Sequence, residues 1–183
     1  MKSLFFSIII LLISLAAYSQ EKKGITLQTD SIIQKDSFSG KPFPEIVVFN
    51  LQKKLINIKL NPDTVYLIDY WASWCRPCIG KLPEYKAFYQ KYKKDAFQIL
   101  SIALDNDYEA WRQSVKENKI SWRNYATLNG FHTQTVKTFH ITGIPFTVLA
   151  GKGNKIIKLD PSEAEIETYL SHHLDPKRKP AQE

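Results

Sequence analysis

The chain has 183 residues, of which 44% are hydrophobic and 23% are charged, a composition typical of a globular domain rather than a disordered or collagen-like chain. Its two cysteines are too few for a multi-disulfide scaffold, so the fold must rest on an apolar core. The formal net charge of +7 suits acidic partners or a membrane surface, but solvated lysines are the commoner explanation.

The amino terminus is typical of an export signal. Lys2 supplies a positive charge, residues 4–17 form an apolar run broken only by serines, and small residues precede a predicted cleavage site before Gln20. An uncleaved anchor is the alternative, although a spanning helix needs about 20 apolar residues. No cysteine follows the run, which excludes a cysteine-linked lipid anchor. We therefore expect residues 1–19 to be a signal peptide and the mature protein to be periplasmic or otherwise extracytoplasmic.

Polarity divides the remaining chain into three segments. Residues 20–41 are polar with little periodicity and are predicted to be a flexible lead-in. Residues 42–174 carry the apolar patterns of strands and helices and are predicted to be the folded domain. Residues 175–183 form a charged, proline-containing segment that is predicted to be a C-terminal tail.

Short strands and helices alternate through the predicted domain. Residues 46–49 and 55–60 predict a β-hairpin, Thr64 to Tyr70 (TVYLIDY) predicts a buried central strand, and residues 76–94 have the apolar spacing of a helix. The elements predicted after these are a strand at 97–104, a helix capped within residues 105–107, a short strand at 121–127, a short helix at 132–139, a hairpin of strands 146–150 and 155–159, and a last helix with a capping box of Ser162 and Glu165. This alternation predicts an α/β fold with a sheet covered on both faces.

The two cysteines form a CxxC pair where the predicted central strand ends and a helix begins. Unpaired N–H groups and the helix dipole at that point favour Cys75 as a thiolate, the nucleophile of thiol–disulfide exchange. Arg76 adds positive charge, and Pro77 suits the first helical turn because its missing N–H would be unpaired anyway. We expect Cys78 to be the more buried, resolving thiol.

Three other uses of the cysteine pair are weaker. A structural disulfide across so short a loop would restrain little of the unfolded chain. A zinc site needs about four ligands, and the chain has four histidines but no second cysteine pair. Haem attachment needs a histidine where Ile79 stands. We therefore expect a redox role for the pair, with no bound metal and no other cofactor.

At this point the sequence resembles a known family. Residues 71–78 (WASWCRPC) resemble the WCxxC active site of the thioredoxin superfamily, and the export signal and hairpin resemble its TlpA/ResA-like branch of extracytoplasmic thiol–disulfide oxidoreductases. Residues 142–147 (TGIPFT) resemble the cis-proline loop that lies beside the cysteines in that fold. Pro145 follows Cys75 by 70 residues, which leaves room for the strand–helix unit inserted in this branch.

The resemblance covers residues 42–174 and implies a thioredoxin-like fold. That fold is an α/β class with a central mixed β-sheet flanked by helices, an N-terminal β-hairpin and an inserted strand–helix unit. The expected domain order is therefore a signal peptide at 1–19, a flexible lead-in at 20–41, a thioredoxin-like domain at 42–174 and a charged tail at 175–183.

The resemblance also implies roles for individual residues. Asp69 stands six residues before Cys75, the position of a buried aspartate that takes the proton of the second cysteine, here Cys78. The alternative is a strand-end aspartate that faces solvent. The predicted catalytic residues are Cys75, Cys78 and Asp69, and the predicted substrate-binding residues are Trp74, Arg76, Pro77, Ile144 and Pro145.

One position departs from the family pattern. The branch often carries a glutamate three residues after the second cysteine and a proline two residues later; this chain has Lys81 and Pro83 there. One hypothesis is that Lys81 favours nearby thiolates, and the alternative is an ordinary solvated helix lysine.

Together these residues predict an extracytoplasmic thiol–disulfide oxidoreductase, with reduction of protein disulfides favoured over an oxidase or isomerase direction. The expected partners are proteins that carry disulfides or thiols and an upstream electron donor such as a membrane thiol carrier. We expect a monomer that binds no nucleic acid. Two other classes stay open: a copper-binding metallochaperone on the same fold, and a binding module whose redox site is secondary.

Overall fold

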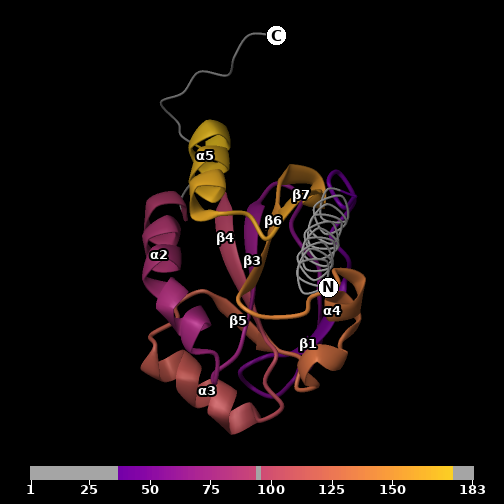
Figure 1. Ribbon diagram of the computed structural model, residues 1–183, viewed down its shortest axis with the longest axis vertical. Coiled ribbons are helices and arrows are strands. Elements are labelled where there is room, and N and C mark those ends of the chain that lie inside the picture. Colours follow the sequence, from indigo (N-terminus) through magenta and orange to yellow (C-terminus); the bar gives the residue numbers. More distant parts are fainter. Residues whose placement is uncertain (1–36, 94–95, 175–183) are drawn as a thin grey trace, which may run out of the picture. The chain divides into compact units, whose positions relative to one another are not determined.

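The structure is a computed structural model that describes residues 37–93 and 96–174 (Figure 1). The predicted signal peptide at 1–19, residues 20–36 of the predicted lead-in and the predicted tail at 175–183 lie outside the described residues. Within the described ranges, no helix is both long and apolar enough to cross a bilayer.

A seven-stranded sheet forms the centre of the described domain, in the order β2-β1-β5-β4-β3-β6-β7. The strands are β1 (Ile46–Phe49), β2 (Leu55–Ile58), β3 (Val65–Trp71), β4 (Phe97–Ala103), β5 (Arg123–Ala126), β6 (Phe146–Ala150) and β7 (Ile156–Leu159). β3 pairs parallel with β4 and antiparallel with β6, so the sheet is mixed. Each of these strands is predicted by the sequence to within two residues at either end.

Helices cover both faces of this sheet. They are α2 (Arg76–Tyr92), α3 (Tyr108–Glu117), α4 (Gln134–Thr138) and α5 (Glu163–Leu174). α2 and α5 lie on one side of the sheet and α4 on the other (Figure 1). Side chains alternate along β3, so Leu67 packs in the cluster formed with α2 and α5, whereas Ile68 packs with Val136 of α4 on the opposite face. α3 packs on the α2 side through Trp111 and Val115. The predicted α/β class, with a mixed sheet flanked by helices, is confirmed.

Side-chain caps define the starts of α3 and α5. The carboxylate of Asp107 accepts hydrogen bonds from the backbone N–H groups of Glu109 and Ala110 at 2.8 and 3.1 Å. Ser162 and Glu165 bond reciprocally: Glu165 accepts the Ser162 N–H at 2.8 Å and donates its own N–H to the Ser162 hydroxyl at 3.4 Å. Both predicted caps are confirmed, and each satisfies backbone donors that a helix start leaves unpaired.

The segment after β5 contains the predicted short helix and an additional turn before it. A single helix is predicted over residues 132–139, but the chain forms a 3₁₀ turn at Gly130–His132 followed by the separate helix α4. Thr133 separates them because its backbone is extended, with φ −80° and ψ 156°. The predicted short helix is therefore confirmed as α4, which begins two residues later than expected, and the sequence prediction misses the 3₁₀ turn before it.

The last residues of the predicted lead-in contact the domain. The Phe38 ring lies 5.4 Å from that of Phe139, and the N–H of Gly40 donates to the carbonyl of Ile156 at 2.8 Å. Phe38 and Gly40 both precede the predicted domain boundary at residue 42, and Gly40 is bonded to β7, the last strand in the order of the sheet.

Candidate active site

The two cysteines lie at the junction between β3 and α2 and are joined by a disulfide with an S–S distance of 1.99 Å. Cys75 is the N-cap residue of α2, and its sulfur accepts the backbone N–H of Cys78 at 3.2 Å. Pro77 follows within the first turn. The sulfur of Cys75 therefore lies where helix N–H groups favour a negative charge. Both cysteines are buried, with 4% and 2% of their surface exposed.

The loop that leads into Cys75 is hydrogen-bonded to a residue that follows β4. The backbone N–H of Ser73 donates to both carboxylate oxygens of Asp105, at 3.2 and 3.0 Å, and the Ser73 hydroxyl also donates to Asp105. Burial raises the pKa of Asp105, and the bonds from Ser73 oppose that rise. Sequence reasoning places Asp105 only in the cap region of the next helix and misses this contact.

The proline loop approaches the cysteines from the other side. The Ile144–Pro145 peptide bond is cis, and the carbonyl oxygen of Ile144 lies 3.8 Å from the sulfur of Cys75. Both residues are half-buried, and Gly143 before them is exposed. Residues about 70 positions apart in the chain thus form one surface around the disulfide.

Exposed side chains extend this surface. Trp74 has 60% of its surface exposed, and Arg76 and Pro77 are exposed beside it. Trp71 differs, because it is fully buried in a cluster that contains both cysteines and Trp111. The structure therefore separates a tryptophan that can contact a partner from one that supports the site from below.

Asp69 lies in the middle of the buried strand β3, with 1% of its surface exposed, which excludes the solvent-facing alternative. Alternation along β3 places it on the same face as Leu67 and Trp71, the face that α2 covers. Burial raises the pKa of Asp69 from 3.8 to about 7, and a hydrogen bond from Ser101 opposes the rise. A carboxyl in this range both accepts and releases a proton near neutral pH.

Ser101 and Trp122 complete the surroundings of Asp69. The indole N–H of Trp122 donates to the hydroxyl oxygen of Ser101 at 2.8 Å, and that oxygen lies 3.0 Å from Oδ2 of Asp69. Sequence reasoning misses both residues. The available signal is the serine within the apolar run ILSIAL, because parallel pairing of the two strands sets Ser101 opposite Asp69.

The contacts found for the ammonium group of Lys81 are with carboxylates and not with the cysteines. That group pairs with Glu163 of α5 and lies 3.5 Å from Glu84. The hydrogen bond to Glu163 raises the pKa of Lys81. Its charge is therefore shared with two carboxylates, which gives the hypothesis of thiolate stabilisation no direct support.

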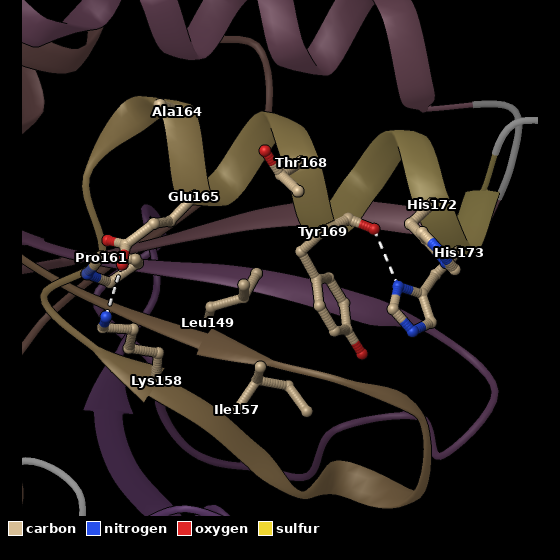
Figure 2. A pocket seen from close by; sticks show the side chains of 10 residues that line it. All are labelled: Leu149, Ile157, Lys158, Pro161, Ala164, Glu165, Thr168, Tyr169, His172 and His173. Carbon is tan, nitrogen blue, oxygen red and sulfur yellow. Dashed lines mark hydrogen bonds and ion pairs between the residues drawn. The ribbon is translucent and has the colours of Figure 1, made fainter.

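A separate pocket lies between β7 and α5 and shares no residue with the cysteine site (Figure 2). Its cavity measures about 480 Å³, and Leu149, Ile157 and Tyr169 contribute apolar surface to it. An ion pair between Lys158 and Glu165, 2.5 Å apart, lies at one end. Across the described part of the chain, no three His, Cys, Asp or Glu side chains are grouped to hold a metal ion.

Comparison with known proteins shows which family the cysteine site and its fold belong to. The model of the thioredoxin-like family matches residues 63–156, a span that contains Asp69, both cysteines and Pro145. The chain belongs to the thioredoxin-like family. It is 28% identical over 171 residues to the thiol-disulfide oxidoreductase ResA of Bacillus thuringiensis subsp. konkukian, an alignment that covers 91% of this chain and 94% of that protein.

Solved structures agree with this assignment. A thiol-disulfide oxidoreductase from Bacteroides fragilis is 27% identical and superimposes with a TM-score of 0.64 over 73% of this chain and 97% of its own. The thioredoxin domain of a thiol-disulfide oxidoreductase from Bacteroides vulgatus, 19% identical, matches the fold with a TM-score of 0.67 over 74% of this chain and 97% of its own. The predicted thioredoxin-like fold and TlpA/ResA-like membership are confirmed, and the chain is a thiol–disulfide oxidoreductase with Cys75 and Cys78 as its CxxC pair.

Proposed function

We propose that this protein works outside the cytoplasmic membrane as a reductase of protein disulfides, with Asp69 as the proton acceptor for Cys78. The observation that supports this most is the buried carboxyl of Asp69, whose pKa of about 7 suits a group that must gain and lose a proton in each cycle. The apolar run at residues 4–17 supports export, with cleavage before Gln20.

The reaction begins with the Cys75 thiolate of the reduced protein. It attacks one sulfur of a substrate disulfide, that S–S bond breaks, and the other substrate sulfur leaves as a thiolate that takes a proton from water. Cys78 then gives its proton to Asp69, and its thiolate attacks the sulfur of Cys75. The Cys75–Cys78 disulfide forms as the bond between Cys75 and the substrate breaks. The second substrate sulfur leaves as a thiolate that takes a proton from water, and two electrons have then passed to the substrate. A dithiol donor, such as a membrane thiol carrier, reduces the pair again.

The surface around the disulfide fits a protein substrate. The exposed indole of Trp74 offers apolar contact area, and the backbone at Ile144–Pro145 lies next to the sulfur that forms the mixed disulfide. Arg76 and Pro77 lie beside it in exposed positions. We infer that an extended segment around the substrate cysteine docks across these residues, and that the protein does so as a monomer without nucleic acid.

Two cysteine variants test this proposal. Wild-type protein should reduce insulin with a dithiol donor, and Cys75→Ser should lose that activity while keeping its fold by circular dichroism. Cys78→Ser should accumulate disulfide-linked partners in cells, because the mixed disulfide can no longer be resolved; mass spectrometry of these species identifies the substrates. An inert wild type, or the absence of trapped species with Cys78→Ser, contradicts the assigned roles.

The reduction potential tests the direction separately. For a reductase we expect the Cys75–Cys78 couple to equilibrate close to the value of thioredoxin, about −270 mV, rather than near the about −120 mV of a strong oxidant. Equilibration of the purified protein with glutathione buffers measures it. A value at the oxidising end would assign the protein to disulfide formation instead, with the same two cysteines.

A further inference from the structure

Asp69 lies at the end of a short chain of hydrogen bonds that begins next to β5. The Trp122 indole N–H donates to Ser101 Oγ at 2.8 Å, and Ser101 Oγ lies 3.0 Å from Asp69 Oδ2. The three side chains are buried, with 6%, 0% and 1% of their surfaces exposed. Hydrogen bonds in such surroundings are stronger than in water and polarise one another.

The chemistry of the indole fixes the direction of this chain. An indole N–H only donates, so the oxygen of Ser101 must be the acceptor of that bond. A hydroxyl has a single proton, and the acceptor found for it among the described residues is Oδ2 of Asp69. Ser101 therefore donates to Oδ2, and a proton on Oδ2 would point at the proton of Ser101.

The two oxygens of Asp69 consequently differ. Oδ2 accepts from Ser101, whereas Oδ1 is buried and has no hydrogen-bond partner within residues 37–93 and 96–174. A buried oxygen without a donor gains most from protonation, because the neutral acid is less costly to bury than the anion.

We propose that Trp122 and Ser101 form a donor relay that reserves Oδ2 of Asp69 as an acceptor and leaves Oδ1 as the atom that takes the proton of Cys78. This inference rests on the proposed role of Asp69. Trp122 and Ser101 act through the carboxyl of Asp69, so both are positioning residues. Their donated bond also stabilises the ionised carboxyl and limits how far burial raises its pKa.

The other groups around Asp69 do not replace this relay. Its neighbours across the sheet are Ser101 and Thr147, which carry no charge. The buried titratable side chains of α2 are Cys78, Tyr85 and Tyr92. Burial and the charge of Asp69 raise the pKa of Tyr85, so its phenol stays neutral. The other charged groups that act on Tyr85 are Glu84, Asp160 and Glu163.

The relay is best tested in the oxidised protein, in which neither cysteine titrates. Carbon-13 NMR of labelled aspartate carboxyls gives the titration of Asp69, assigned by its absence in Asp69→Asn. We expect Ser101→Ala to move this titration upward by about one pH unit or more, because a bond to a charged group is lost. Trp122→Phe should move it upward by less, since the hydroxyl remains but is no longer oriented. Ser101→Thr should titrate like the wild type.

Trp111→Phe is the matched control. Trp111 is also a buried tryptophan on the α2 side, but its N–H donates to Asn124 at 2.7 Å rather than to Ser101. The relay is wrong if Ser101→Ala titrates like the wild type, or if Trp111→Phe shifts the titration as much as Trp122→Phe. If Ser101→Ala does not fold, the two tryptophan variants decide the matter. Failure of the proposed role of Asp69 is a different result: Asp69→Asn would then resolve mixed disulfides at the wild-type rate, whatever the titrations show.

Discussion

Asp69 and Asp105 are two buried carboxyls, one on the strand that leads into the cysteine loop and one bonded to that loop, and they differ in the donors that reach them. Asp105 receives the backbone N–H and the hydroxyl of Ser73, so both of its oxygens are bonded. Asp69 receives a bond from Ser101 at Oδ2 and has no partner at Oδ1 among the described residues. Burial raises the pKa of both. The number of donors therefore separates a carboxyl that holds a loop from one that can take a proton.

The largest expected effect comes from Asp69→Asn, which keeps the shape of the side chain but removes the site that accepts a proton. We expect resolution of the mixed disulfide by Cys78 to slow by about 10²–10⁴-fold, the usual contribution of a general base. Attack by Cys75 on the substrate should change much less, because its thiolate is stabilised by the helix start. The two steps can be separated by quenching single turnovers with acid and measuring the amount of mixed disulfide over time by mass spectrometry.

Asp107→Asn is the control for this substitution. Asp107 caps α3 with its side-chain oxygen, and asparagine caps helices as well as aspartate does. It should leave both steps unchanged. Equal slowing of resolution in the two variants would mean that loss of any nearby negative charge, rather than loss of the proton acceptor, explains the result.

The same carboxyl should make stability depend on pH. Because the pKa of Asp69 is 3.8 when exposed and about 7 in the fold, the folded state binds more protons between these values, and stability falls as pH rises from about 4 to 7. The loss amounts to roughly 4 kcal/mol in total. Urea unfolding of the oxidised protein should show this fall, and Asp69→Asn should lose most of it, since only the smaller contribution of Asp105 remains. If the free energy of unfolding depended on pH in the same way in both proteins, the pKa of Asp69 would be the same in the folded and unfolded states.

The comparison of Asp69 with Asp105 also shows how much of the site can be predicted from the sequence. The CxxC motif and the alternation of apolar runs predict the fold class and the position of Asp69 on a buried strand, because these features depend on local spacing. The partners of Asp69 and Asp105 are Ser101 and Ser73, each 32 residues away in sequence. Such pairs follow from strand register, and single polar residues carry no periodic signal of their own.

A smaller effect is expected from the loop carboxyl. Asp105→Ala removes the acceptor of Ser73 and leaves a part-buried backbone N–H without its partner. We expect a loss of about 1–3 kcal/mol in the free energy of unfolding. Attack by Cys75 should slow, because the turn before it is no longer fixed, whereas the fall in stability between about pH 4 and 7 should persist, since Asp69 is untouched. If that fall disappeared in Asp105→Ala, the pH dependence of stability would belong to Asp105 and not to Asp69.

The exposed carboxylates beside Lys81 should contribute least. Glu84 and Glu163 share the ammonium of Lys81 on the surface between α2 and α5, where all three side chains are 39–43% exposed. Water and salt screen such pairs, so Lys81→Met should change the free energy of unfolding by about 0–1 kcal/mol. Because the positive charge is already shared with two carboxylates, we also expect the pH dependence of alkylation of Cys75 in the reduced protein to stay the same. A rise in the pH at which Cys75 becomes reactive would instead show that Lys81 stabilises the thiolate through space, so that an exposed charge on α2 contributes to the site together with the start of the helix.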